Sequence, residues 1–263
     1  MPFNFPKRMG NLAMGSNALL KALQVLETFQ NDTGALTVQD MADLTRQTKS
    51  SAQRSVYTLE KLGYLQRYDD GARYVPGRSC LGPAYGFLQN NRLLEAATPF
   101  LLDLSEKVGM RAHLSVLEGT DIIYLSRIPS QEERLTLSPL GKRWPAVNAS
   151  SGRAILAALP AEERERIITA SRLKKITSQT LVDLPSISEA IQKAKADGYA
   201  YQREEVLPGV ASVSSAVVGT NGQVYGAVIL SGPVARFQDS EDRQRLGEAV
   251  VQATCSIGAC NLS

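Results

Sequence analysis

The sequence has little of the chemistry that catalytic and metal sites need. It contains one histidine, one tryptophan and three cysteines in 263 residues. Cys80, Cys255 and Cys260 are odd in number and scattered, unlike a disulfide framework or paired metal ligands. His113 lies in a strand-like stretch with no Cys or Asp motif that would make it a catalytic base. We therefore expect no metal site, no cofactor and a reducing compartment.

Long apolar runs and enzyme signatures are also missing. The longest runs, Ala154–Leu159 and Val224–Leu230, fall far short of the roughly 20 residues that cross a bilayer. Lys7 and Arg8 near the N-terminus are not followed by the apolar core of a signal peptide. There is no nucleophile elbow, phosphate loop or dinucleotide fingerprint. These absences predict a cytoplasmic protein that is not an enzyme and has no membrane partner.

The small excess of positive charge lies towards the N-terminus. The formal net charge is +3, and residues 1–80 hold ten basic and seven acidic side chains, while the rest of the chain balances. Within Thr45–Arg78 there are seven basic and three acidic residues, a modest patch that would attract a phosphate backbone. A solvated charged face is the commoner cause of such a patch. The length of the chain favours two domains.

Residues 16–78 follow the plan of a winged helix, after an aperiodic arm at 1–15 that we expect to be flexible. Thr37 can cap a helix, with Asp40 in the reciprocal capping-box position. Gly63 suits a left-handed helix end, and an Asp-Asp-Gly turn predicts a β-hairpin. The expected elements are helices over 19–29, 38–44 and 49–62 and strands over 64–68 and 72–75.

The third of these helices carries the side chains that a recognition helix needs. At about 100° per residue one of its faces is apolar and the other polar, and a recognition helix reads base edges with such a polar face. Arginine and glutamine offer paired donors to bases, and hydroxyls suit phosphate oxygens. The alternative is a small helical subdomain with a charged surface. The predicted DNA-binding residues are Arg46, Lys49, Ser50, Ser51, Gln53, Arg54 and Tyr57, with Arg67 and Arg73 on the hairpin flanks.

Beyond the hairpin, strand-like and helical patterns alternate. Residues 79–96 are expected to form a linker helix, centred on Tyr85–Leu94, and another helix is expected from about Pro99 to Val108. Residues 97–263 then predict one domain with a mixed sheet and helices. The expected strands are 112–117, 122–126, 135–137, 199–202, 211–218 and 224–230, and the expected helices are 151–158, 162–170, 186–196 and 239–257.

Several stretches in both halves of the chain resemble one known family, over about residues 17–260. The family is the isocitrate lyase regulator (IclR) family of transcription factors, and the matching stretches are Ala22–Glu27, Lys49–Arg54, Thr58–Leu65, Gly198-Tyr199, Glu204-Glu205, Gly209, Gly222, Ser231-Gly232-Pro233 and Arg236. The resemblance implies an α+β fold class, with an N-terminal winged helix-turn-helix joined by a linker helix to a C-terminal GAF-like α/β effector-binding domain.

The resemblance also implies a function. We expect a ligand-responsive regulator, a repressor of a catabolic operon, that binds a palindromic double-stranded DNA operator as a homodimer or tetramer. A small organic acid is expected to release or remodel it. Two residues depart from the family, because Arg46 and Thr48 stand where it usually has glycine and proline. An arginine is strained there if the turn needs a positive φ, although its side chain can add a phosphate contact.

The stretch Trp144–Ala154 resembles one wall of the family's effector pocket. Asn148, Ser150 or Ser151 can cap a helix that follows, and exposed backbone N–H groups at such an end favour a carboxylate, which could be held without a buried cation. An ordinary cap or strand hydroxyl is the other interpretation of each serine, and Trp144 can either stack on an aromatic acid or pack in the core. By resemblance the effector-binding residues are Trp144, Ser150, Ser151, Gln202, Val210, Ser212, Ile229 and Ser231, with Gln202 where some members have an acidic residue.

The sequence is also compatible with a second function: a stand-alone small-molecule-binding or catalytic domain whose winged helix contacts protein. Gel shifts with the DNA upstream of the gene separate the two functions, because only a regulator gives sequence-specific, salt-sensitive binding.

Overall fold

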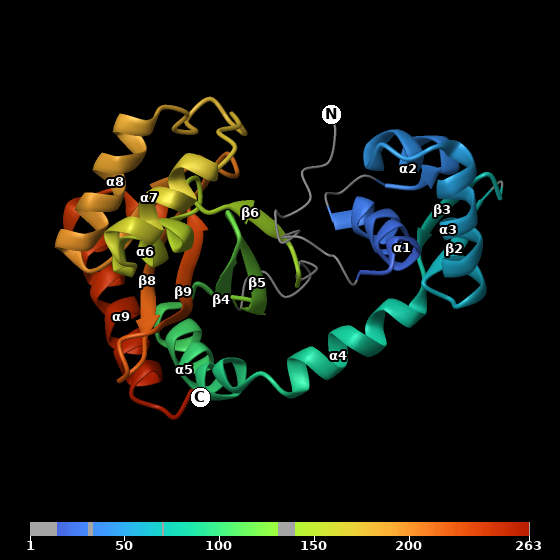
Figure 1. The fold of residues 1–263 in the computed structure, drawn as a ribbon. Coiled ribbons are helices and arrows are strands. Elements are labelled where there is room, and N and C mark those ends of the chain that lie inside the picture. The colour runs from blue at the N-terminus through green and yellow to red at the C-terminus, as the bar shows by residue number, and fades with distance from the viewer. Residues whose placement is uncertain (1–14, 31–33, 70, 131–139, 263) are drawn as a thin grey trace. The chain divides into compact units, whose positions relative to one another are not determined.

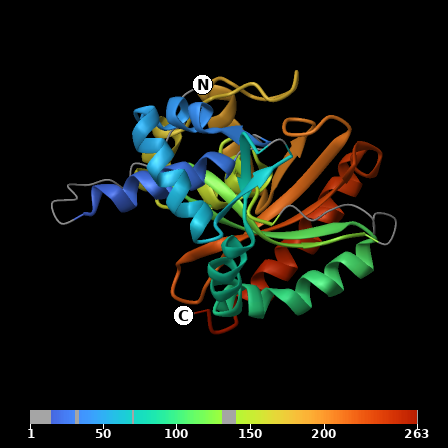
Figure 2. The same cartoon turned by 90° about the vertical axis from the view of Figure 1, so that its right-hand side faces the viewer.

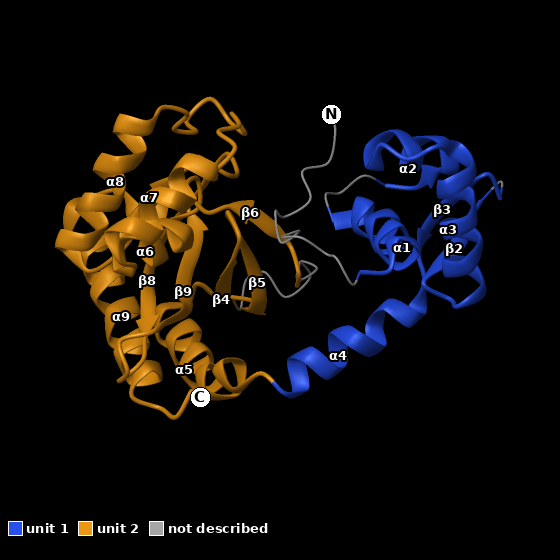
Figure 3. Ribbon diagram, in the orientation of Figure 1, with its two compact units in different colours: residues 1–90 blue, residues 91–263 orange. Residues whose placement is uncertain are grey.

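The computed structural model describes residues 15–30, 34–69, 71–130 and 140–262, which form two compact units. The N-terminal unit is Met1–Asn90 and the C-terminal unit is Asn91–Ser263 (Figure 3). The expected flexible arm, apart from its last residue, and the expected strand at 135–137 lie outside the described residues. Within the described ranges, no helix combines the length and the apolar character needed to span a membrane.

The helices predicted for the N-terminal unit are confirmed as α1 (Asn17–Glu27) with the short η1 (Thr28–Gln30), α2 (Val38–Thr45) and α3 (Lys49–Lys61) (Figure 1). Each α-helix begins after a polar residue whose side chain accepts a first-turn N–H: Ser16, Thr37 and Thr48. Thr37 and Asp40 form the expected capping box, with Asp40 Oδ2 2.9 Å from the Thr37 backbone nitrogen.

A three-stranded antiparallel sheet completes the N-terminal unit. It consists of β1 (Leu36–Thr37), β2 (Leu65–Tyr68) and β3 (Arg73–Pro76) in the order β1-β3-β2. The predicted hairpin of β2 and β3 is confirmed, and Gly63 has the left-handed conformation expected of it, with φ +77°. The strand β1 was not expected, because two residues carry no periodic signal. The core beneath the helices contains Val25, Met41, Val56, Leu59, Leu65 and Tyr74.

The expected single linker helix is two helices. The first, α4 (Leu81–Gln89), follows the short η2 (Arg78–Cys80) and ends the N-terminal unit, and α5 (Arg92–Val108) opens the C-terminal unit. The break falls here because Asn91 caps α5, with its Oδ1 accepting a first-turn N–H at 2.9 Å. Pro99, expected near the start of a helix, lies inside α5. None of the side chains of α4 is buried.

The C-terminal unit is built on a six-stranded sheet in the order β6-β5-β4-β9-β8-β7. Every neighbouring pair is antiparallel, so the expectation of a mixed sheet is wrong. Alternating strand and helix patterns suggested parallel crossovers, but β4–β5 and β8–β9 are neighbours in sequence that pair directly and therefore run antiparallel. The strands are β4 (Arg111–Glu118), β5 (Asp121–Ile128), β6 (Arg143–Pro145), β7 (Ala200–Arg203), β8 (Val210–Val218) and β9 (Val224–Pro233). Of these, only the short β6 was not expected.

Helices cover both faces of this sheet. Figure 2 shows α5 in green beside α9 (Ser240–Gly258) in red, and these two share one core with the sheet. The other face is covered by α6 (Ser150–Ala158), α7 (Ala161–Ala170) and α8 (Leu184–Asp197), and η4 (Val234–Phe237) leads from β9 to α9 (Figure 1). Because strand side chains alternate, Ala112 and Leu114 of β4 enter the α5–α9 core, whereas Arg111 and His113 lie on the α6 side.

Candidate functional site

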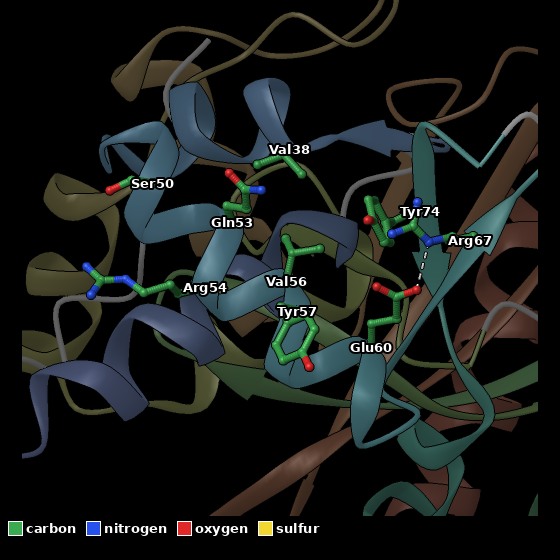
Figure 4. A pocket seen from close by; sticks show the side chains of 9 residues that line it. All are labelled: Val38, Ser50, Gln53, Arg54, Val56, Tyr57, Glu60, Arg67 and Tyr74. Atoms are coloured by element: carbon green, nitrogen blue, oxygen red, sulfur yellow. Dashed lines mark hydrogen bonds and ion pairs between the residues drawn. The ribbon is translucent and has the colours of Figure 1, made fainter.

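The exposed face of α3 borders a groove in the N-terminal unit (Figure 4). The groove has a volume of about 580 Å³, and Arg67 and Tyr74 of the hairpin form its other side. The predicted DNA-binding residues that line it from α3, all of them exposed, are Ser50, Gln53, Arg54 and Tyr57. Lys49 is exposed at the start of the same helix. The polar face expected of α3 is therefore exposed to solvent.

The turn before α3 takes up the positive φ for which glycine is suited. Arg46 ends α2 at φ 55° and ψ 34°, a left-handed conformation that costs a residue with a Cβ on the order of 1 kcal/mol. Its side chain is exposed. Thr48, at the position of the family's proline, caps α3, and its Oγ1 lies 3.3 Å from the Ser51 nitrogen. Arg46 and Thr48 thus keep the helix-turn-helix geometry with different side chains.

Ser51 does not lie on this exposed face. Its side chain is buried, and its Oγ donates to Gln47 Oε1 at 2.9 Å. The Gln47 amide donates in turn to the Lys21 carbonyl at 3.0 Å, which ties the turn to α1. Ser51 therefore serves the packing of the unit, and the structure does not place it on the surface predicted for DNA.

The two arginines of the hairpin are held by their own unit. Arg67 Nε lies 2.8 Å from Glu60 Oε1, the contact drawn in Figure 4, and this hydrogen bond raises the pKa of Arg67. Arg73 lies 4.0 Å from Asp69, and its guanidinium sits over the Tyr68 ring. These contacts orient both cations without burying them.

A cavity of about 270 Å³ lies in the C-terminal unit between the sheet and the start of α6. Every residue predicted for the effector site lines it: Trp144, Ser150, Ser151, Gln202, Val210, Ser212, Ile229 and Ser231. The remaining lining residues were missed: Arg111, His113, Tyr124, Arg127, Lys142, Ala149, Val206 and Leu207. The alternation along β4 could have placed Arg111 and His113 on one face, but nothing local in the sequence pairs them with β5.

A cluster of hydroxyl groups lies where α6 meets β8. Ser150 Oγ is 2.8 Å from Ser212 Oγ and 2.6 Å from Ser214 Oγ. The side-chain amide of Gln202 lies 3.0 Å from Ser212 Oγ. With its nitrogen towards Ser212, the Gln202 oxygen accepts from the backbone N–H of Glu205 at 2.6 Å, so this amide is satisfied on both sides.

Contrary to expectation, no described side chain caps α6. Ala149 is the N-cap residue, and the Asn148 amide donates instead to the Leu181 carbonyl at 2.9 Å. The first N–H groups of a helix have no partner within it, and together with the helix dipole they attract an anion. Gly152 brings this end close to the preceding loop, since a Cβ there would lie 2.1 Å from the Ala146 carbonyl oxygen.

Cationic side chains, which the sequence did not predict for this site, line another part of the cavity. Arg111, Arg127 and Lys142 are half-buried in the lining, and none of the described lining residues is acidic. Burial, with Arg127 and Arg111 nearby, lowers the pKa of His113 to about 3, so its ring is neutral at pH 7. His113 Nε2 lies 2.8 Å from Ser231 Oγ.

Two aromatic rings complete this part of the wall. The Trp144 ring lies in the lining with the ammonium group of Lys142 5.0 Å from its centre, so Trp144 is not a plain core residue. The Tyr124 ring is 5.2 Å from the His113 ring, and burial raises the pKa of Tyr124 to about 12. Tyr124 therefore stays neutral and contributes a hydroxyl without a charge.

A buried ion pair anchors the loop between β7 and β8, which borders the cavity. Arg153 of α6 and Glu205 share two hydrogen bonds of 2.7 and 2.6 Å, and Arg153 Nε also donates to the Val147 carbonyl at 2.8 Å. Val206 and Leu207, which follow Glu205, line the cavity. In the part of the chain that the structure describes, no group of three or more His, Cys, Asp or Glu side chains is placed to hold a metal ion.

A winged helix-turn-helix followed by a separate α/β unit with a cavity lined by polar and cationic side chains is the arrangement of a ligand-responsive transcriptional regulator. Two family models match the chain: the IclR helix-turn-helix domain over residues 18–69 and the bacterial transcriptional regulator IclR C-terminal domain over residues 85–259. The chain belongs to the IclR family of bacterial transcriptional regulators.

Named relatives agree with this assignment. The chain is 32% identical to the Pca regulon regulatory protein of Pseudomonas putida, covering 87% of this chain and 78% of that protein. It is 28% identical to the regulator BhcR of Paracoccus denitrificans, covering 91% and 85% of the two chains. Because the chain belongs to this family of transcriptional regulators, it is a regulator and not an enzyme.

Solved structures share the fold. A putative transcriptional regulator from a Rhodococcus species matches with a TM-score of 0.74 and 28% identity, over 93% of this chain and 97% of that one. An IclR homologue of Microbacterium hydrocarbonoxydans, crystallised with 4-hydroxybenzoate, matches with a TM-score of 0.71 and 24% identity, over 92% and 98%. At that identity the second match establishes the fold alone.

Proposed function

We propose that this regulator represses a catabolic operon by binding a palindromic operator as a homodimer or dimer of dimers, and that a small organic acid bound in its cavity releases it. The observation that carries the proposal is the cavity itself, which combines three cations and an uncapped helix start with no acidic side chain among its described lining residues. Such a site favours an anion over a neutral or cationic ligand.

DNA binding is assigned to the exposed face of α3. Arg54 and Gln53 suit base edges, and Lys49 and Ser50 suit phosphates, because guanidinium and amide groups form paired hydrogen bonds with bases. Arg46, Arg67 and Arg73 add positive charge around this face. Since a recognition helix spans one half-site, a palindrome requires two copies one helical turn apart.

A second copy of the chain would also account for the exposed apolar side chains of α4. Its exposed Leu81, Tyr85 and Phe87 find no partner among the described residues of their own unit, since none of the side chains of α4 is buried. Large apolar side chains gathered on one exposed helix favour contact with another protein surface. A homodimer would cover them. Repression is proposed in line with a relative named as a repressor, AllR of Klebsiella pneumoniae, which is 26% identical.

The effector site is tested with Ser151→Leu, whose bulk blocks the start of α6. Small acids are screened by the rise in melting temperature, since a ligand that binds only the native state stabilises it. The best acid is then added to gel shifts with DNA from upstream of the gene. Ser151→Leu should keep operator binding and lose the response to the acid, whereas Ser178→Leu, an exposed serine outside the cavity lining, should keep both. Wild-type affinity of Ser151→Leu for the acid would refute the site.

A further inference from the structure

The groove beside α3 contains an acidic residue on the surface proposed for DNA. Among the described residues that line the groove, Glu60 alone is acidic. A carboxylate there repels phosphate, so on charge alone it would weaken DNA binding. Its side chain is 25% exposed, and its Oε1 lies 2.8 Å from Arg67 Nε (Figure 4). The structure therefore gives this carboxylate a partner within its own unit.

Arg67 contacts three parts of the N-terminal unit. Its Nε donates to Glu60 Oε1, near the C-terminal end of α3, and its Nη1 donates to the Gly71 carbonyl at 2.6 Å. Its guanidinium carbon lies 5.2 Å from the centre of the Tyr74 ring on β3. Gly71 belongs to the hairpin turn, where its φ is +76° and its N–H donates to the Tyr68 carbonyl at 3.0 Å. One side chain thus joins α3, the turn and β3.

The two arginines of the hairpin lie on opposite faces of it. The register pairs Arg67 with Tyr74, and both line the groove beside α3. At the next position the register pairs Arg73 with Tyr68, and adjacent positions along a strand point to opposite faces. The Arg73 guanidinium lies over the Tyr68 ring, and it is 4.0 Å from its acidic partner. Its own unit therefore holds Arg73 more loosely than Arg67.

We propose that Arg67 is a positioning residue for DNA binding: anchored by Glu60, it holds the hairpin turn against α3 and keeps these contacts in the complex with DNA. Because a carboxylate at 2.8 Å offsets its charge, Arg67 offers little net charge to a phosphate. The phosphate contact of the hairpin is assigned to Arg73. A turn that is held in place before binding does not have to be ordered on binding, which favours affinity. This inference rests on the proposed DNA-binding face of α3.

The sign of the effect of Glu60→Ala tests the proposal. The full-length protein is titrated onto DNA from upstream of the gene, and affinity is followed by fluorescence anisotropy. Affinity should fall about threefold to tenfold, because the turn must then be ordered on binding. Repulsion alone predicts the opposite, since loss of a carboxylate near phosphates strengthens binding. Asp43→Ala removes an exposed carboxylate of α2 outside the groove lining, so it measures the effect of charge alone and should not weaken binding.

Variants of Arg67 distinguish a positioning residue from a phosphate contact. Arg67→Ala should weaken binding as much as Glu60→Ala and leave the salt slope unchanged, whereas loss of a phosphate contact lowers that slope by about 0.9. Arg67→Lys keeps the charge but loses the planar fork that bonds Glu60 and the Gly71 carbonyl together, so it should recover only a small part of the affinity. The double variant of Glu60→Ala and Arg67→Ala should bind no more weakly than either single variant, because the two side chains act together.

Two controls separate positioning from loss of folding. The pair is exposed, so its loss should cost the unit little stability, which melting curves check. If Glu60→Ala fails to fold, Glu60→Gln repeats the test of sign with a side chain of the same shape. In hydroxyl-radical footprints of the same DNA, Glu60→Ala and Arg67→Ala should lose the protection that Arg73→Ala loses and keep the protection that Arg54→Ala loses.

The outcomes separate this inference from the proposed function. The inference is wrong if Glu60→Ala binds the DNA as tightly as the wild-type protein or more tightly. It is also wrong if Arg67→Lys restores wild-type affinity, or if the single effects add in the double variant, because Arg67 would then meet DNA independently of Glu60. In each of these cases α3 remains the DNA-binding face as long as Arg54→Ala weakens binding. If the wild-type protein binds no fragment of the upstream DNA, the proposed function and this inference fail together.

Discussion

In the N-terminal unit the side chains proposed to meet DNA come mainly from one stretch, Arg46–Tyr57, whereas in the C-terminal unit the cavity is lined from α6 and all six strands of the sheet. A recognition surface of the first kind needs one helix and its turn, and most of its charges stay in water. A cavity of the second kind needs the register of the whole sheet, and its charges are partly desolvated. The two units should therefore respond differently to mutation and to pH.

The largest expected effect comes from the buried ion pair of the C-terminal unit. Glu205→Gln leaves the Arg153 guanidinium, which is 1% exposed, without its counter-charge. This should lower the free energy of unfolding of the C-terminal unit by about 3–5 kcal/mol and leave the N-terminal unit unchanged. Chemical denaturation of the full chain, followed by separate probes in each unit, measures this. Glu163→Gln, which breaks the exposed pair with Arg166, should cost less than about 1 kcal/mol.

The second largest effect is expected from acid, which should lower the stability of the C-terminal unit through His113. The folded-state pKa of His113 is lowered to about 3 from an ordinary 6.5, so the unfolded chain takes up the proton first. The stability of the C-terminal unit is therefore complete above about pH 6.5 and falls by roughly 1.4 kcal/mol per pH unit as the pH drops towards 3. The N-terminal unit has no histidine, because His113 is the only one in the chain.

Melting curves between pH 8 and pH 5 check this prediction. His113→Gln cannot titrate and should flatten the pH dependence of the C-terminal transition over this range. An unchanged slope in His113→Gln would mean that other groups cause the acid sensitivity.

A smaller effect is expected on DNA affinity. Arg54→Ala should weaken operator binding by about 1–3 kcal/mol and reduce discrimination against scrambled DNA, since a lost base contact costs that much. Arg73→Ala, if it touches only phosphate, should weaken binding to both DNAs alike and flatten the salt dependence. Titrations of both variants at several salt concentrations distinguish the two roles, and identical behaviour would contradict them.

The smallest effect concerns the strained turn. Arg46→Gly removes a Cβ from a residue at φ 55° and should stabilise the N-terminal unit by up to about 1 kcal/mol. Arg46→Ala keeps the Cβ, so it should give no such gain. Both variants lose the side-chain charge, and both should lower the salt slope of DNA binding by about one if Arg46 contacts a phosphate.

The sequence predicted the N-terminal unit better than the cavity, because the first depends on neighbouring residues and the second on distant strands. The capping box of Thr37 and Asp40, the turn at Gly63 and the polar face of α3 are local, so spacing alone located them. The residues predicted for the effector site came from the resemblance, and all of them line one cavity. Ser51 was misplaced because a hydroxyl one residue beyond Ser50 looks equally polar in sequence, although its side chain bonds Gln47 inside the unit.

The sequence by itself determined where most helices and strands lie, which face of α3 is polar and to which family the chain is similar, because those properties depend on residues within a few positions of one another. Only the tertiary structure decided that the sheet is antiparallel throughout, that Asn91 divides the linker, and that Arg111, His113 and Arg127 share a cavity with α6. Strand pairing joins residues far apart in the chain, and no periodicity records which strand will be the neighbour.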